Sequence, residues 1–397
     1  MTDLLQSFSP WFFLFVLFVV VDAAKVYVEI WNRPRRRHYT SDLSQVTALI
    51  ATFNGEAVIR ETILNLFKLG LENDQILVID DGSTDRTPEI VEALGVRLYS
   101  VPNMGKVSAI NFGIHRVKTE YVMLLDDDTR VATAKIPTGL LEKYDAVAFN
   151  VVPDRRDRHG PSGSSLMSCI QRYEYCKSME IGRRFQDQAA SIACISGAIG
   201  LFKRKRLQAY HHVHSGAFEG EDLQRTLIEH LFRGEVVFAD EVVWTVVPDN
   251  PRGLLRQRLF SWYPAQYHMF WNFWRILLAR HIRLRLRYEM AYSLFVVLFE
   301  PFRFLSLVML LYYRRWLELI VIYILYLLLE LLPFVLVQRK INSGRRVLVF
   351  VLFPVYGLIN MVLRLFALVV FVWKRWVSKD MRPKTEEDRR WWLSPER

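Results

Sequence analysis

Apolar residues are distributed along this chain in two patterns. Long, almost uninterrupted apolar runs lie at 10–24 (extended by Tyr27, Val28 and Ile30), 288–313, 316–337 and 347–373. Each reaches the roughly 20 residues that a helix needs to cross a bilayer. From Val46 onward the apolar residues instead come in short runs separated by turns. The pattern predicts an α/β domain placed between membrane segments.

The short runs alternate between two periodicities. Runs rich in β-branched and aliphatic residues predict strands at 46–52, 75–79, 96–101 and 121–125, and a further strand at 146–152. Apolar residues at helical spacing predict helices at 57–69, 87–94 and 105–117. Strands that alternate with helices are typical of a parallel, doubly wound sheet, which binds ligands at the carboxyl ends of its strands.

Polar side chains follow three of these strands directly. They are Thr52–Asn54, Asp80-Asp81 and Asp126–Asp128. Adjacent carboxylates repel one another and are costly to bury unpaired, so a divalent cation shared with a phosphate-bearing substrate is their usual partner. For the triplet alone, a solvated acidic turn is the alternative. The coincidence at three strand ends favours a binding site.

Three further stretches contain candidate functional residues. Glu219–Asp222 precedes a helical pattern, where acidic residues either do chemistry or only complement the helix dipole. Ser196–Gly200 is a small-residue stretch where a backbone or ligand can approach closely. His211, His212 and His214 are suited to a metal, but no further ligand spacing supports a closed site, so a solvated histidine cluster is favoured.

Charge next to the first apolar run predicts its orientation. Arg33 and Arg35–Arg37 follow the run, which places the N-terminus outside and the next segment in the cytoplasm. A cleaved signal peptide has its charges before the apolar core, so the reversed order favours an uncleaved anchor. The last three runs enclose Glu300, Arg303, Glu330 and Arg364, which should face protein or a wet cavity because charges are costly in lipid.

Two features of these last runs leave the number of crossings open. Glu300-Pro301 could break the first of the three into a kinked or re-entrant piece. If all three cross, the basic C-terminal tail lies outside, against the positive-inside rule.

Composition agrees with a membrane protein. The chain of 397 residues is 52% hydrophobic and has a formal net charge of +11, and its basic residues flank apolar runs. Anionic lipid and topology therefore explain the charge better than nucleic acid does. Three cysteines without a CxxC pattern argue against a disulfide framework and fit a reducing cytoplasm. Basic and aromatic residues alternate over 251–287, which resembles interfacial amphipathic helices.

These patterns divide the chain into five parts. We expect an N-terminal transmembrane anchor (1–32), a cytoplasmic catalytic domain (33–250), interfacial helices (251–287), about three transmembrane helices (288–374) and a charged tail (375–397).

Five motifs then occur in a fixed order. They are Thr52-Phe53-Asn54-Gly55-Glu56, Val78-Ile79-Asp80-Asp81-Gly82-Ser83-Thr84-Asp85, Asn103-Met104-Gly105-Lys106 continuing to Gly113, Leu125-Asp126-Asp127-Asp128-Thr129, and Gly220-Glu221-Asp222. The series resembles the family 2 glycosyltransferases with a GT-A fold. The resemblance implies an α/β domain with a Rossmann-like mixed sheet. The flanking apolar segments are similar to those of the membrane-integrated synthases of hyaluronan, chitin oligosaccharides, poly-N-acetylglucosamine and cellulose.

The resemblance implies a role for each motif. It assigns the uridine and ribose of a UDP-sugar to Thr52, Asn54, Glu56, Asp80 and Asp81, with Lys106 beside the nucleotide. It assigns Mg²⁺ or Mn²⁺ on the diphosphate to Asp126 and Asp128, with Asp127 as spacer. Ser196 and Gly197 would form the floor of the acceptor site. Asp222, next to Glu221, would be the general base.

The family's last motif, Q-x-x-R-W, is altered here. Gln257-Arg258-Leu259 matches its start, but Trp262 comes one residue late and no arginine precedes it. The resemblance still implies that Gln257, Arg258 and Trp262 contact the acceptor, with Arg258 as the cation that faces the phosphates. The departure bears on processivity and acceptor type.

These observations predict an inverting, metal-dependent hexosyltransferase in the plasma (inner) membrane with its catalytic domain in the cytoplasm. It would extend a polysaccharide from a UDP-sugar and translocate the product. The alternative is a non-processive enzyme that glycosylates ceramide, diacylglycerol or polyprenyl phosphate. A non-catalytic scaffold is disfavoured, because unpaired carboxylates without a role are costly to bury.

Overall fold

An eight-stranded sheet forms the centre of the α/β domain. The computed structural model of the protein describes residues 8–32, 37–133, 135–154, 165–214, 220–341 and 343–377. The strand order is β3-β2-β1-β4-β7-β6-β8-β5. The strands are β1 (Val46–Thr52), β2 (Ile76–Asp80), β3 (Arg97–Ser100), β4 (Tyr121–Leu125), β5 (Arg130–Val131), β6 (Ala146–Pro153), β7 (Ile199–Lys203) and β8 (Val236–Thr245).

The first half of the sheet is the predicted parallel one. β1 pairs in parallel with β2 and β4, and β2 with β3. The second half is mixed, because β7 runs antiparallel to both of its neighbours, β4 and β6. The Rossmann-like mixed sheet that the GT-A resemblance implies is therefore confirmed, and the parallel pattern read from the alternation of strands and helices holds from β3 to β4. The reversal matters, since it brings the segment just before β7 to the same edge where β4 ends.

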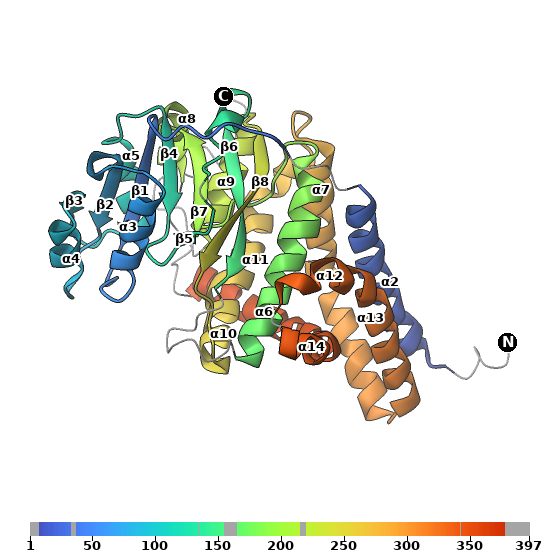
Figure 1. Ribbon diagram of the computed structural model, residues 1–397. Helices are drawn as coiled ribbons and strands as arrows, with labels where there is room; N and C mark the ends of the chain where they lie inside the picture. The colour runs from blue at the N-terminus through green and yellow to red at the C-terminus, as the bar shows by residue number, and fades with distance from the viewer. Residues whose placement is uncertain are drawn as a thin grey trace.

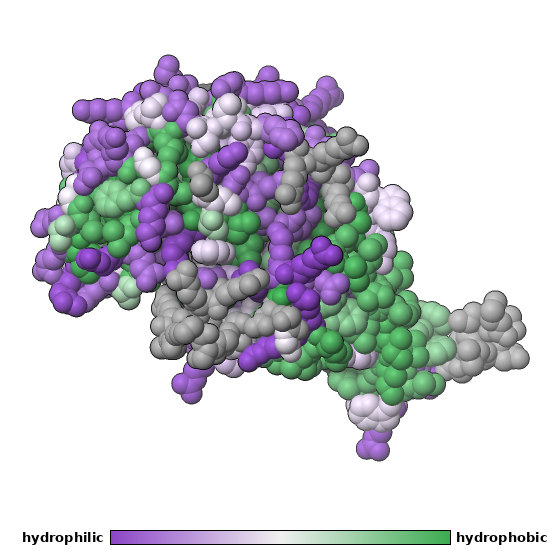
Figure 2. All heavy atoms as spheres, in the orientation of Figure 1, coloured by the Kyte–Doolittle hydropathy of each residue, from purple (hydrophilic) through white to green (hydrophobic). Residues whose placement is uncertain are grey.

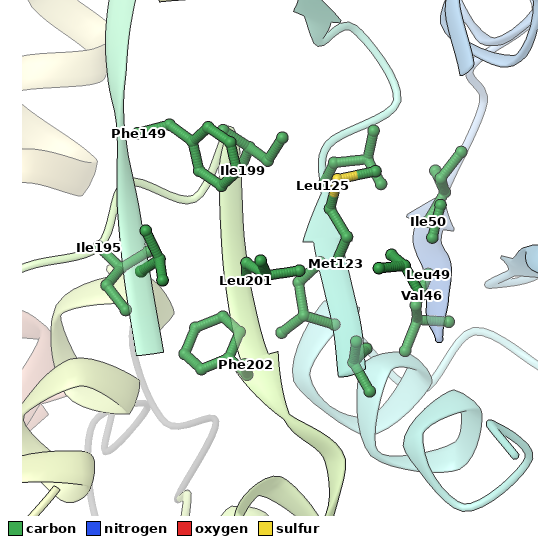
Figure 3. Packing of buried hydrophobic residues seen from close by; sticks show 14 of the residues in the cluster. Val46, Leu49, Ile50, Met123, Leu125, Phe149, Ile195, Ile199, Leu201 and Phe202 are labelled. Carbon is green, nitrogen blue, oxygen red and sulfur yellow. The ribbon is translucent and has the colours of Figure 1, made fainter. Parts of the chain in front are cut away.

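Three helices connect the parallel strands, as predicted. They are α3 (Ile59–Lys68), α4 (Thr87–Ala93) and α5 (Lys106–Ile114). Gly113 lets α5 lie close against β1, because a Cβ there would stand 2.5 Å from Leu49 Cδ1. Inside the sheet the strands are buried on both faces, with Ile50, Met123, Leu125, Phe149, Ile199, Leu201 and Phe202 in one continuous core (Figure 3).

Two long helical segments follow the parallel half, and sequence periodicity predicted neither in full. The first is α6 (Leu166–Lys177), continued by the π-turn η3 (Ser178–Arg183) and α7 (Arg184–Asp187). The second is α10 (Pro251–Gln257), the π-turn η5 (Arg258–Trp262) and α11 (Tyr263–Phe273), within the stretch expected to be interfacial. Between them lie α8 (Arg204–Tyr210) and α9 (Glu221–Leu231).

Four helices are long and apolar enough to cross a membrane. Counted with the turns that continue two of them, they are Pro10–Trp31 (α2), Leu284–Tyr312 (α12), Trp316–Lys340 (α13, Trp316–Val337) and Arg346–Trp376 (α14, Arg346–Val372). Figure 1 shows α2, α12 and α13 side by side at one end of the molecule, beyond the α/β domain. Figure 2 shows the matching division of the surface, with hydrophilic residues over the domain and hydrophobic ones over the bundle. α12 continues through Pro301, so of the two possibilities that the sequence left open at Glu300-Pro301 the structure has the continuous helix.

The charges inside the apolar runs all have partners, as predicted. Arg303 Nη1 lies 3.0 Å from Asp22 Oδ2, which joins α12 to α2. Arg364 Nη2 lies 2.9 Å from Glu300 Oε1, and Lys177 Nζ lies 2.7 Å from Glu330 Oε1. Breaking such a buried pair costs about 3–5 kcal/mol, so these contacts hold the helices in one arrangement.

Candidate active site

The polar strand ends meet at one edge of the sheet. Thr52 is in register with Asp80, and Ile50 with Leu125. Residues two positions beyond Leu125 are therefore level with Thr52, and Thr52 Oγ1 donates a hydrogen bond to Asp127 Oδ2 at 2.6 Å. The structure thus brings together the three polar sets that sequence placed at strand ends.

Lys106 links two of the candidate carboxylates. Its ammonium lies 2.7 Å from Asp126 Oδ1 and 2.6 Å from Glu221 Oε1. Burial alone would lower the pKa of Lys106, but the two carboxylates outweigh it and raise the pKa. Burial would raise the pKa of Glu221, yet Lys106 and Arg225 hold it at about 2. Burial raises the pKa of Asp126, although Lys106 opposes the shift. Lys106, Asp126 and Glu221 therefore form one group, in which a single ammonium lies between two carboxylates.

Asp222 is held from several sides. Its Oδ2 accepts a hydrogen bond from the Gly197 backbone N–H at 3.0 Å, and its Oδ1 accepts from Leu223 N at 2.8 Å. Burial, reinforced by the negative charge of Glu221, raises the pKa of Asp222 despite these two hydrogen bonds. A carboxylate with a raised pKa is a stronger base than an ordinary aspartate, which suits it to accept a proton.

Gly197 stands among three of the acidic side chains. A Cβ built there would lie 3.6 Å from Glu221 Oε1, 3.7 Å from Asp126 Oδ2 and 3.7 Å from Asp222 Cβ. The antiparallel entry of β7 places it there, because Asp126 N donates to the Ala198 carbonyl at 3.1 Å. Ser196 belongs to the same turn, where its backbone carbonyl accepts a hydrogen bond from Ile199 N.

One face of α9 holds the segment that leads to Gly197. Asp222, Thr226 and His230 follow one another at intervals of four residues, so they share that face. Thr226 Oγ1 accepts from Ile195 N at 2.8 Å, and His230 Nε2 bonds the Ile192 carbonyl at 2.8 Å. Roles for Thr226 and His230 were not predicted from the sequence. Their spacing of four and eight residues from Asp222 indicates that they share its helix face.

The expected nucleotide residues lie at the same edge and shape its loops. Asp81 accepts hydrogen bonds from Met104 N and Gly105 N, at 2.8 and 2.9 Å. The other three make similar contacts: Asp80 accepts from Ser83 N, Asn54 from Thr84 N, and Glu56 from Arg86 Nε. Asp80 and Asp81 are buried, whereas Glu56 is paired with Arg86 at the surface.

Tyr175 is a second residue that sequence reasoning missed. It lies on α6, and its ring centroid is 5.7 Å from that of Trp262. Burial raises the pKa of its phenol, and the charges of Asp222 and Asp128 act in the same direction. Tyr175 and Trp262 therefore flank the carboxylates from the side of the long helices.

The altered Q-x-x-R-W stretch does not form one cluster. Arg258 is 1% exposed, and its guanidinium pairs with Glu174 at 2.5 Å and bonds the Tyr356 hydroxyl at 3.0 Å. Its expected role of facing phosphate stays a prediction. Gln257 lines a separate cavity of about 380 Å³ with Asp154, Ser168 and the 245–250 segment. Trp262 lies beside Tyr175, and the guanidinium carbon of Arg258 lies 3.8 Å from the centroid of the Trp262 ring.

The histidine cluster differs from expectation in one respect. His211 and His214 are buried rather than solvated, with ring centroids 5.5 Å apart, while His212 is exposed. Burial lowers the pKa of His214 to about 4. Glu219 lies outside the described residues.

Among the residues that the structure describes, no group of three or more His, Cys, Asp or Glu side chains is arranged to hold a metal. Asp126 and Asp128 offer the hard oxygen atoms that Mg²⁺ and Mn²⁺ prefer, and such a metal takes its other ligands from phosphate and water. The residues present therefore fit a metal shared with a diphosphate.

Comparison with known proteins agrees with this geometry. Residues 47–209 match the family model described as "Glycosyl transferase family 2". The chain is 28% identical over 268 residues to a poly-β-1,6-N-acetyl-D-glucosamine synthase of Staphylococcus epidermidis, covering 64% of this chain and 60% of the relative. It is 30% identical over 227 residues to the protein of that name in Staphylococcus aureus, covering 55% and 54%. The chain thus spans little more than half the length of these relatives.

A solved structure resembles almost the whole chain. It is a mannosyltransferase from Pyrobaculum calidifontis in complex with GDP-mannose and Mn²⁺. The TM-score is 0.60 at 15% identity, and the match covers 92% of this chain and 99% of the other. At this identity the likeness concerns the fold.

Proposed function

We propose that this chain, whose residues 47–209 match the model described as Glycosyl transferase family 2, is a membrane-bound, inverting glycosyltransferase. It would extend a polysaccharide from a UDP-sugar and translocate the product. The observation that carries the proposal is the group of Asp126, Lys106, Glu221 and Asp222 around Gly197. In this group Lys106 is the cation that would face the diphosphate, Asp222 is the proposed base, and Gly197 leaves space beside Asp222 for the acceptor.

Asp222 is the proposed general base. The acceptor hydroxyl oxygen forms a bond to the anomeric carbon of the donor while the bond from that carbon to the diphosphate breaks. The hydroxyl proton passes to Asp222, and the nucleoside diphosphate leaves. One base without an enzymic nucleophile predicts a single displacement with inversion, by analogy with the two-carboxylate chemistry of glycosidases.

Lys106 and the strand-end carboxylates serve the leaving group. The Lys106 ammonium is positioned to stabilise negative charge as it develops on the diphosphate. Asp126 and Asp128 would hold Mg²⁺ or Mn²⁺, which supplies Lewis-acid stabilisation of that charge when bound. Mn²⁺ is present with the nucleotide sugar in the mannosyltransferase of similar fold.

Gly197 and Trp262 bound the proposed acceptor site. The absence of a side chain at Gly197 leaves room beside Asp222 for a sugar hydroxyl. Trp262 offers an aromatic face on which a sugar ring could stack. Arg258 bonds Glu174 and Tyr356 and lies over the Trp262 ring at 3.8 Å, so we assign it the role of orienting Trp262.

The donor screen is the experiment that tests this function. The full-length protein would be purified into nanodiscs and given labelled UDP-sugars with Mg²⁺ or Mn²⁺, starting with UDP-N-acetylglucosamine because of the relatives' names. A ladder of growing products that is absent from an Asp222→Asn sample supports polymer synthesis. No transfer from any UDP-sugar contradicts it.

A second function is favoured by one observation. The altered Q-x-x-R-W stretch leaves the acceptor site without the motif's arginine, which suits an acceptor bound mainly by its lipid. The enzyme would then add one sugar to ceramide, diacylglycerol or polyprenyl phosphate. Turnover that requires added lipid and gives a single-sugar product decides for this alternative.

We also propose that the protein lies in the plasma (inner) membrane with its catalytic domain in the cytoplasm. UDP-sugars are cytoplasmic metabolites, and the basic residues after α2 favour that side.

A further inference from the structure

The N-terminal end of α14 lies against the α/β domain. The chain reaches α14 from the turn η7 (Gln338–Lys340). Lys340 forms an ion pair with Glu180 of η3, and its carbonyl accepts a hydrogen bond from Arg172 Nε at 2.6 Å. The segment that leads into α14 is therefore held by α6 and η3.

The C-terminal end of α14 lies against the same domain. In the following turn, η9 (Trp373–Val377), Lys374 Nζ donates to the Phe260 carbonyl at 3.2 Å. The rings of Trp376 and Trp271 meet edge to face with centroids 5.2 Å apart. Trp271 belongs to α11, whose Met269, Phe270 and Phe273 pack against Tyr210, Leu227 and Ile228 of the domain.

These contacts are incompatible with a crossing helix. α14 has 27 residues, which at 1.5 Å per residue make a rod of about 40 Å, longer than the roughly 30 Å hydrocarbon core. A crossing would leave its two ends on opposite sides of the bilayer. Both ends instead contact helical segments that pack against one domain, and Figure 1 shows α14 passing below that domain beside α6.

α14 also has two distinct faces. Towards the protein, the Tyr356 hydroxyl bonds Arg258 and Glu174, and the Arg364 carbonyl accepts from the Tyr267 hydroxyl at 2.7 Å. The opposite face exposes a stripe of large apolar residues at helical spacing, Leu348, Val351, Val355, Ile359, Phe366, Val369 and Val372. The protein-facing side is itself mostly apolar, with Val349, Leu363 and Phe371 buried in hydrophobic clusters against other helices. The exposed apolar stripe runs along the whole helix and is suited to contact with lipid.

We propose that α14 lies in the plane of the membrane, with its apolar stripe inserted in the leaflet next to the catalytic domain. Only α2, α12 and α13 then cross the bilayer, and the C-terminal tail lies on the side of the catalytic domain. The arrangement also removes the conflict between the basic tail and the positive-inside rule, since Lys379, Arg382 and Lys384 of the tail stay inside.

The placement would affect the acceptor end of the site. α14 contacts the η5–α11 segment through Arg258 and Tyr267, and that segment carries Trp262. Lipids that contact α14 would therefore influence the position of Trp262 through the η5–α11 segment. The inference itself requires no glycosyl transfer.

Cysteine labelling tests on which side the tail lies. Ser394→Cys would be compared in the full-length protein with Asn32→Cys, after α2, and Tyr313→Cys, between α12 and α13. A membrane-impermeant maleimide would be applied to right-side-out and inside-out vesicles, with the unsubstituted protein as background. We expect Ser394→Cys to label in the same vesicles as Asn32→Cys. Labelling together with Tyr313→Cys overturns the proposal.

Depth measurements test the in-plane orientation separately. Spin labels would be placed at Leu348, Ile359 and Val369 of α14, and at Ile324 of α13 as a deep control, all of which are exposed. An in-plane helix gives three similar, shallow depths, whereas Ile324 lies deep. A label at Ile359 as deep as Ile324, with shallower labels on either side, overturns the proposal. Both measurements are made without substrate, so their outcome is independent of the proposed enzymatic function.

Discussion

Asp222 and Gly197 are joined by a hydrogen bond of 3.0 Å from the glycine N–H to the carboxylate. The bond connects the start of α9 to the turn before β7, two segments that sequence places 25 residues apart. It also aims Asp222 at the space that Gly197 leaves open. The proposed base and the proposed acceptor floor are therefore a single structural unit.

Asp222→Asn should abolish sugar transfer while UDP binding stays nearly intact. Loss of a general base lowers rates by about 10²- to 10⁴-fold. Turnover and UDP affinity would be measured on the same preparation, with the exposed Asp74→Asn as a control of equal charge change. Loss of UDP binding in Asp222→Asn would contradict the assignment of this residue as the base.

Asp128→Ala should weaken nucleotide binding only when Mg²⁺ or Mn²⁺ is present. Asp127→Ala is its matched control, because the Asp127 carboxylate accepts a hydrogen bond from Thr52. Losing that bond should cost about 1.5–3 kcal/mol of stability, with metal dependence unchanged. Nucleotide titrations with and without metal, and thermal unfolding, separate the two effects. An Asp128→Ala protein with normal metal dependence would remove Asp128 from the proposed ligands.

Gly197→Ala should impair acceptor use without unfolding the protein. The new methyl group would meet its neighbours at 3.6 to 3.7 Å, which is ordinary van der Waals contact, but it would fill the space beside Asp222. We expect a higher KM for the acceptor or a lower kcat, and a Tm close to that of the parent. Gly357→Ala is the control, because a Cβ there meets nothing within 4 Å. Unchanged kinetics in Gly197→Ala would place the acceptor elsewhere.

His230 should make stability fall in mild acid. Burial lowers the pKa of His230 to about 4 from an ordinary value of 6.5. A depressed pKa in the folded state means that stability is fully present above pH 6.5 and is lost as pH falls towards 4. At pH 5 the loss is about 2 kcal/mol by proton linkage.

Thermal unfolding of His230→Gln between pH 7.5 and 5 checks this, with the exposed His281→Gln as control. The glutamine amide can still donate to the Ile192 carbonyl but does not titrate, so His230→Gln should be less acid-sensitive than the parent. Equal acid sensitivity of His230→Gln and parent would show that another group is responsible.

Arg258→Met should destabilise the protein more than it impairs chemistry. Arg258 is fully buried against Glu174 and Tyr356, and removing one partner of a buried pair costs about 3–5 kcal/mol. Adding Glu174→Gln should restore part of the lost Tm, because it removes the unpaired charge. If transfer by the double variant fell by orders of magnitude at a restored Tm, Arg258 would have a direct role at the diphosphate.

Sequence determined the parallel half of the sheet and the polar edge at which we propose that the nucleotide binds. Parallel strands share one carboxyl edge, so Thr52, Asp80 and Asp126 had to come together once the alternation of strands and helices was recognised. Hydropathy likewise identified the four long helices, and the cost of charge in lipid predicted that Glu300 and Arg364 would be paired.

Only the tertiary structure decided which residues surround the base and which way α14 runs. The antiparallel entry of β7 brings Gly197 to Asp126, and the helix pitch aligns Thr226 and His230 with Asp222. Arg258 resembles a motif residue in sequence but is neutralised by Glu174, a partner 84 residues away. Hydropathy reports the length of an apolar helix but not its direction, which depends on contacts at both ends. These features depend on long-range pairing, which local patterns of residues do not encode.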